Sequence, residues 1–216
     1  PSAGADPPSG DASDPPKLRV LLTYGGHGFE EKAFFDMFDR LPGIVLTKAP
    51  MPESADMLKP GLEQQYDAIV MYDMVASIPA ESRQRFVELL KDRGIGVVSL
   101  HHNLGAHADW DEFRKIIGGR FVLRECEIDG VKHAPSGWSH GEDLRIRVAD
   151  ADHPIVKGLG DFDIHDETYS NYWTAPDAKV LLKTDHPKND PEIAWVRQYG
   201  RSRVFYLMLG HDSRAW

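Results

Sequence analysis

Short apolar runs alternate with amphipathic segments through the first half of the chain. The runs, which are typical of strands buried on both faces, lie at residues 18–24, 44–49, 68–72 and 96–100. Between the first two, residues 30–41 place Phe34, Phe38 and Leu41 at offsets of four and three, which predicts a helix with one apolar face. This alternation of strands and helices predicts a doubly wound, mostly parallel α/β sheet.

Two more helices are expected before residue 120. Pro79 suits the first turn of a helix in which Phe86, Leu89 and Leu90 face inward. The other helix runs from about residue 110 to residue 117 and is ended by Gly118-Gly119.

The pattern changes after residue 120. Extra strands are expected at 121–128 and 144–148, with a loop at 137–141 between them. Two segments, 153–159 and 163–169, are expected to be mostly irregular. The end of the chain returns to strands, at 180–184, 193–199 and 203–209. Residues 200–202 would join the last two strands as an antiparallel hairpin.

The first 16 residues differ in composition from the rest. They are rich in Pro, Gly, Ser and Asp and have no apolar side chain larger than alanine, so we expect a flexible tail followed by a single domain at 17–216. The sequence starts at Pro1 without a methionine, so export after removal of a leader and a cytoplasmic location both stay open. No apolar run approaches the roughly 20 residues of a membrane helix, so we expect a soluble protein.

The charge and the cysteine content exclude several classes of partner and of structural site. The formal net charge of −9 argues against nucleic acid or an anionic membrane as the partner and leaves small neutral ligands open. Cys126 is the single cysteine, which excludes an intrachain disulfide and a thiolate zinc ribbon. A homo-oligomer is compatible with the sequence.

Polar residues follow the predicted strands where each strand ends. His27 follows the first strand, Asp73 the third, His101-His102 the central one and His211-Asp212 the last. In an open α/β sheet, ligands bind just beyond the carboxyl ends of the strands. These side chains are therefore expected to share one site.

Ordered motifs along residues 17–216 carry a resemblance to a known family. They are Gly25-Gly26-His27 with Phe29-Glu30, Leu100-His101-His102 with Gly105, Trp110 with Phe113 and Gly118-Gly119, His153-Pro154, Asp166-Glu167 with Tyr169, Trp195 with Tyr199-Gly200 and Arg203, and Gly210-His211-Asp212. Together they resemble the ThuA-like family of trehalose-utilisation proteins. The resemblance implies a flavodoxin-like fold, akin to class I glutamine amidotransferases, and a role in carbohydrate metabolism with a small carbohydrate as ligand.

Glutamine hydrolysis does not fit these residues. An amidotransferase needs a cysteine on the sharp turn after its central strand, with a histidine nearby. That turn holds His101-His102 here, and Cys126 lies in a different segment. Ser99 lies within the predicted strand, and the chain has no Gly-x-Ser-x-Gly elbow.

Imidazole and carboxylate remain as the candidate chemistry. His27, His102 and His211 are the predicted ligands of a divalent ion such as zinc, manganese or nickel, and no nucleotide cofactor is expected. The alternative is a cluster of hydrogen-bonded polar side chains that binds the hydroxyl groups of a sugar. His101 is expected to point away and to be satisfied by backbone, as one of two adjacent residues leaving a strand usually is.

The predicted reaction acts on a sugar or keto-sugar, by isomerisation, elimination or hydrolysis. In a 3-keto-glycoside, His102 or His211 would remove the C2 proton while the ion or a group oriented by Glu167 stabilises the enediolate. The predicted substrate contacts are His27, Glu30, Asp73, His140, Tyr169 and Asp212. For Glu30, a helix-start role is the competing interpretation. A carbohydrate-binding or assembly module without catalysis, and a metal-dependent hydrolase of esters or amides, stay open as alternatives.

Overall fold

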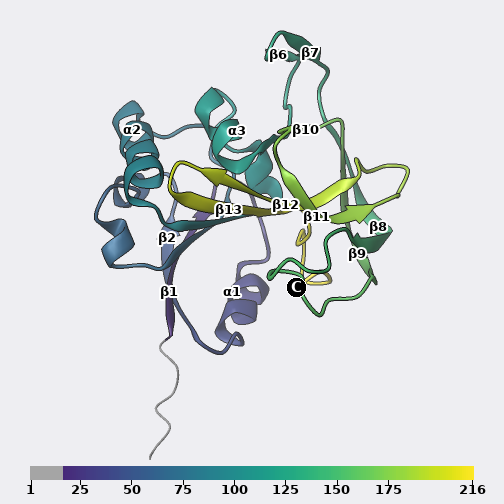
Figure 1. Cartoon of the computed structure of the whole chain (residues 1–216), viewed down its shortest axis with the longest axis horizontal. Coiled ribbons are helices and arrows are strands. Elements are labelled where there is room, and N and C mark those ends of the chain that lie inside the picture. Colours follow the sequence, from purple (N-terminus) through teal and green to yellow (C-terminus); the bar gives the residue numbers. More distant parts are fainter. Residues whose placement is uncertain (1–16) are drawn as a thin grey trace, which may run out of the picture.

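A twisted nine-stranded sheet forms the centre of the protein (Figure 1). The computed structural model describes residues 17–216, so the predicted tail at 1–16 lies outside the described residues. The strand order is β2-β1-β3-β4-β13-β12-β11-β8-β9. The bounds are β1 (Leu18–Gly25), β2 (Ile44–Pro50), β3 (Ala68–Asp73), β4 (Gly96–Leu100), β8 (Gly137–Val148), β9 (Phe162–Ser170), β11 (Lys179–Thr184), β12 (Glu192–Tyr199) and β13 (Ser202–Leu207).

The sheet has a parallel half and an antiparallel half. Strands β2, β1, β3, β4 and β13 pair in parallel, whereas the pairings from β13 through β12, β11, β8 and β9 are antiparallel. The predicted α/β fold with a parallel core and added antiparallel strands is therefore confirmed. The terminal hairpin is confirmed as well, since Tyr199 on β12 pairs with Ser202 on β13.

Helices cover both faces of the parallel half. Phe34 and Phe38 of α1 (Glu31–Asp39) pack with Val20 and Leu22 of β1. The alternate residue Leu21 belongs to a second core, together with apolar residues of α2 (Ala80–Glu88) and α3 (Asp111–Ile117). A strand whose successive side chains enter two different cores is buried on both faces, which explains its continuous apolar sequence. No helix within residues 17–216 is long and apolar enough to cross a membrane.

Short helical turns complete the helical structure of the described residues. Their bounds are η1 (Ala55–Met57), η2 (Leu62–Gln64), η3 (Leu89–Arg93) and η4 (His101–Gly105). The turn η4 follows β4 directly, so it lies at the carboxyl end of a strand within the parallel half of the sheet.

The region between residues 119 and 174 differs from the sequence prediction. The loop expected at 137–141 and the irregular segment expected at 163–169 are both wrong, because these residues belong to the long antiparallel pair β8–β9. Of the strand expected at 121–128, only the last three residues are extended. They form β6 (Cys126–Ile128), which makes a small hairpin with β7 (Val131–His133); two further short strands are β5 (Gly119–Arg120) and β10 (Trp173–Thr174).

Candidate active site

The turn after β4 presents His101 in an uncommon backbone conformation. His101 begins η4 with a φ of 47°, in the left-handed region that non-glycine residues rarely occupy. Tyr206 donates a hydrogen bond from its hydroxyl to the His101 carbonyl at 2.9 Å, and the His101 side chain is buried. The surrounding contacts therefore hold a strained residue in place, as is common at functional sites.

A backbone carbonyl sets the tautomer of His101. Its Nδ1 lies 2.6 Å from the carbonyl oxygen of Met208. A carbonyl only accepts hydrogen bonds, so Nδ1 carries a proton, and in the neutral form of the ring Nε2 is the unprotonated nitrogen. A histidine that binds a metal through one nitrogen very often donates from the other to a carbonyl in this way.

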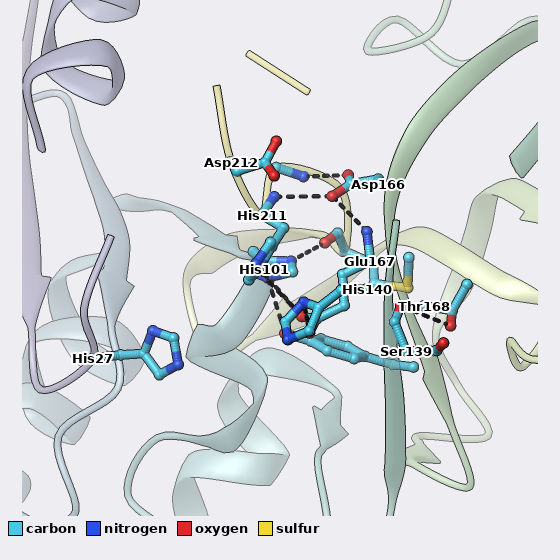
Figure 2. Close-up of polar contacts among 12 residues, drawn as sticks. His27, His101, Ser139, His140, Asp166, Glu167, Thr168, His211 and Asp212 are labelled. Carbon is cyan, nitrogen blue, oxygen red and sulfur yellow. Dashed lines mark hydrogen bonds and ion pairs between the residues drawn. The ribbon is translucent and has the colours of Figure 1, made fainter. Parts of the chain in front are cut away.

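The side chains of Glu167 and His211, from distant parts of the chain, converge on that Nε2 (Figure 2). Oε2 of Glu167, on β9, lies 3.1 Å from His101 Nε2, and Nδ1 of His211, after β13, lies 3.2 Å from it. The third side of the triangle, from His211 Nδ1 to Glu167 Oε2, is 3.4 Å. Ligand atoms at the usual 2.0–2.1 Å from a tetrahedral zinc lie about 3.3 Å apart. These three residues, which we call the His-Glu-His cluster, therefore fit a divalent cation.

The electrostatics of the cluster favour a positive charge next to Glu167. Burial alone would raise the pKa of Glu167, but hydrogen bonds and charges from His101 and His211 outweigh burial and hold that pKa well below its usual range. The Glu167 partner in turn raises the pKa of His211, against the opposing effect of burial. Two acceptors, Glu167 Oε2 and an unprotonated His101 Nε2, repel one another at 3.1 Å unless a proton or a cation lies between them.

Asp166 fixes two members of the cluster relative to each other. Its buried carboxylate accepts hydrogen bonds from the backbone N–H groups of Gly210 at 2.7 Å, His211 at 3.0 Å and Glu167 at 2.8 Å. One side chain on β9 thus positions the backbone of the turn after β13 against its own strand (Figure 2).

A cavity of about 180 Å³ opens over the cluster. Besides the three cluster residues, its wall includes His27, His102, Trp138, His140 and Tyr169. His140, on β8, is half exposed and its Nδ1 lies 2.9 Å from Oε1 of Glu167, the oxygen that faces away from His101. Glu167 therefore contacts histidines on both of its oxygens.

His102 and His27 lie apart from the cluster. His102 Nε2 donates to the carbonyl oxygen of Tyr72 at 2.9 Å. Burial is the main cause that lowers the pKa of His102 to about 3, so its ring is neutral. The ring centroids of His27 and His102 are 4.7 Å apart, and Figure 2 shows His27 well away from Glu167. The predicted ligand set of His27, His102 and His211 thus shares only His211 with the cluster.

The expectation that His101 points away from the site is wrong, because its side chain lies at the centre of the cluster. Its backbone partner, Met208, satisfies one ring nitrogen, as expected, but leaves the other for the site. Glu167 and His211, both singled out from the sequence, are brought together. His140 and Tyr169 line the cavity, and Tyr169 Oη lies 3.0 Å from His101 Nε2.

Three other predicted contacts have partners outside the cavity wall. The side chain of Asp73 is fully buried and accepts a hydrogen bond from Thr23 Oγ1 at 2.5 Å. Glu30 precedes α1 and accepts from the backbone N–H of Ser213 at 2.9 Å, and Asp212 forms an ion pair with Arg214.

The turn after β4 consists of His101 to Gly105. His101 occupies the position after β4 where an amidotransferase needs its cysteine. Cys126 lies on β6, and the described cavity wall contains neither cysteine nor serine.

Comparison with known proteins identifies the family. The sequence model of ThuA, described as trehalose utilisation, matches residues 48–216. The chain belongs to the ThuA family. A comparison with curated protein sequences finds no match.

Solved structures agree with the ThuA fold. A ThuA-like protein from Parabacteroides merdae superposes with a TM-score of 0.71 at 19% identity, over 92% of this chain and 84% of that chain. Another from Bacteroides uniformis gives a TM-score of 0.68 at 22% identity, over 98% and 89%. A GMP synthase protein from Thermoplasma acidophilum gives 0.52 at 11% identity, over 88% and 83%. The last similarity supports the amidotransferase-like fold.

Proposed function

We propose that this ThuA-family protein is an enzyme acting on a sugar or keto-sugar, with a divalent cation held by His101, Glu167 and His211. The observation that carries the proposal is the convergence of one oxygen and two nitrogen atoms at separations of 3.1 to 3.4 Å. Two imidazoles and one carboxylate suit zinc, manganese or nickel. A cation bound there supplies Lewis-acid polarisation of a substrate carbonyl group.

His140 is the general base in this proposal. Donation from its Nδ1–H to Oε1 of Glu167 leaves Nε2 as the proton acceptor, the arrangement in which a carboxylate orients a catalytic imidazole. The ring lines the cavity and is half exposed, so a substrate can reach it. His102 is less suited, because a pKa of about 3 makes it a weak base.

The proposed substrate is a 3-keto-glycoside. Its C3 ketone acidifies the neighbouring C2–H, whose proton passes to His140 while the C–H bonding pair forms the enolate between C2 and C3. When the enolate collapses, the bond from C1 to its substituent breaks and the departing oxygen takes the proton from His140. In isomerisation, His140 instead returns the proton to C3, and the proton of the C2 hydroxyl moves to the C3 oxygen, so that the ketone passes from C3 to C2.

Cavity size and family both support a sugar. The volume of about 180 Å³ lies below the range of about 300–1,000 Å³ that is usual for drug-sized ligands, which suits one sugar ring. The family description, trehalose utilisation, also points to carbohydrate.

A carbohydrate-binding module without catalysis is the second candidate. The exposed Trp138 at the cavity favours it, because an aromatic side chain that is 62% exposed offers a face for stacking. This candidate requires ligand binding that does not depend on the His-Glu-His cluster.

The test is consumption of 3-keto-glucosides by protein loaded separately with zinc, manganese or nickel. We expect turnover by the wild type and its loss in Glu167→Gln, which keeps the size of the side chain but removes its charge. If the wild type and Glu167→Gln bind the glucosides with equal affinity, and neither turns them over with any of the metals, the carbohydrate-binding module is favoured.

A further inference from the structure

Two exposed apolar side chains stand at the cavity mouth. Leu123, in the segment between β5 and β6, is 50% exposed, and Trp138, on β8, is 62% exposed. Both line the same cavity whose inner wall carries the His-Glu-His cluster. Exposed large apolar residues that gather from separate segments at a cavity indicate a surface that a ligand covers.

Hydrogen bonds hold the two segments together. The backbone of Val122, next to Leu123, pairs with Ser136 through N–H to Oγ and through Ser136 N–H to its carbonyl, both at 2.8 Å. Ser136 Oγ also donates to the carbonyl of Asn171 at 2.8 Å. Trp138 pairs with Tyr169 across β8 and β9. The apolar mouth is therefore built on a fixed backbone frame, which lowers the entropy cost of binding.

A row of rings connects this mouth with the cluster. The ring centroids of Trp138 and His140 lie 4.8 Å apart, those of His140 and His211 lie 4.5 Å apart, and those of His211 and His101 lie 5.3 Å apart. A ligand that reaches the cluster with one end can thus contact Trp138 with its other end.

The cavity wall also bears on the group at the outer end of the ligand. Within the described residues this wall contains neither Lys nor Arg. A charged group next to Leu123 and Trp138, away from the His-Glu-His cluster, would have no cationic side chain to pair with. This end of the wall therefore suits an apolar group.

We propose that Leu123 and Trp138 form a subsite for the group attached to the sugar, and that the substrates are glycosides with an uncharged, planar, apolar aglycone. This inference rests on the proposed function for the position of the sugar ring. The ring would occupy the cavity of about 180 Å³, and the aglycone would stack on Trp138 outside it.

The test compares binding of methyl and phenyl glucosides, in both anomeric forms, by calorimetry. These parent compounds lack the 3-ketone and its acidic proton, so their affinities are read independently of turnover. We expect one phenyl glucoside to bind about tenfold more tightly than its methyl counterpart, as stacking on an indole predicts. In Trp138→Ala the preference for the phenyl glucoside should disappear, while the affinity for the methyl glucoside stays unchanged. In Leu123→Ala the same preference should become smaller.

Ile155→Ala is the matched control, since Ile155 is also 50% exposed but does not line the cavity. Equal affinity of the wild type for both glucosides, or no binding of either, overturns the subsite. If Trp138→Ala loses affinity equally for the methyl and the phenyl glucoside, the subsite is also overturned, because the indole would then stack on the sugar itself. Failure of the proposed enzyme function is read separately, from unconsumed 3-keto-glucosides.

Discussion

Nε2 of His101 lies 3.1 Å from Oε2 of Glu167, although one residue follows β4 and the other lies on β9. The turn that delivers His101 has a left-handed φ of 47°, and a cysteine is what an amidotransferase needs at that turn. The same fold can therefore present a neutral imidazole nitrogen to a carboxylate. This arrangement is the basis of the proposed acid–base and metal chemistry.

Asp166→Asn tests how the cluster is positioned. An amide cannot accept with both of its atoms, so at least one N–H of Gly210, His211 or Glu167 loses its partner. We expect metal affinity to fall about 10- to 100-fold, as for other residues that orient ligands, with a loss of about 1–3 kcal/mol in the free energy of unfolding. Metal titration and denaturant unfolding measure the two effects.

Asp163→Asn is the control for that variant. Asp163 lies on the same strand but is exposed and pairs with Arg145 at the surface. Its substitution should leave metal affinity unchanged and alter the unfolding free energy by less than about 1 kcal/mol. Equal metal affinity in the two variants would contradict the positioning role of Asp166.

His140→Gln tests the proposed base separately from the proposed cation site. His140 contacts Glu167 from the side opposite to His101, so the three cluster ligands stay in place. We expect kcat with a 3-keto-glucoside to fall about 10²- to 10⁴-fold while bound metal stays at the wild-type level. Steady-state kinetics and elemental analysis check both values, and an unchanged kcat would exclude His140 as the base.

Asp73→Asn should change how stability depends on pH. Burial raises the pKa of Asp73 to about 6, against a smaller opposing effect of the Thr23 hydrogen bond. A raised folded-state pKa gives stability that is fully present below the unfolded pKa of about 3.9 and is lost as pH rises through about 6. The variant lacks this loss, so its stability relative to the wild type should rise by about 2–3 kcal/mol between pH 4 and pH 8.

The neighbouring His107 changes stability with pH in the opposite direction, and it is present in both the wild type and Asp73→Asn. Its Nε2 lies 3.8 Å from Asp73 Oδ2, and burial lowers the pKa of His107 to about 4. Its contribution to stability is therefore lost as pH falls from about 6.5 toward 4. Urea unfolding at several pH values gives the difference in the free energy of unfolding between the wild type and Asp73→Asn. A difference that does not change with pH would contradict the raised pKa of Asp73.

The sequence predicts the parallel half of the fold well. The middle of the strand at 18–25, Val20 to Leu22, enters two apolar cores, so its successive positions are apolar and the signal is strong. The strand expected at 144–148 is the second part of β8. The first part of β8 and the whole of β9 escape prediction because their residues are rich in Asp, Glu, His and Ser, which are not typical of strands. These polar side chains serve the cavity and the solvent-facing side instead of a second core.

The site is only partly predictable for a related reason. Strand ends place His211 near the central turn, and the order of motifs singles out Glu167. Two adjacent histidines, however, give no signal that tells which one enters the site. That choice depends on the φ of His101 and on its contacts with Met208 and Tyr206, which lie more than 100 residues further along the chain.

Adjacent histidines provide the most direct test of the cation site. The measurement is elemental analysis, after loading with zinc, manganese or nickel, of the wild type, His101→Gln and His102→Gln. Glutamine at 102 can still donate to the Tyr72 carbonyl, so that variant controls for folding. We predict near-stoichiometric metal in the wild type and in His102→Gln, and its loss in His101→Gln. Metal retained by His101→Gln, or absent from all three proteins, would contradict the proposed cation site.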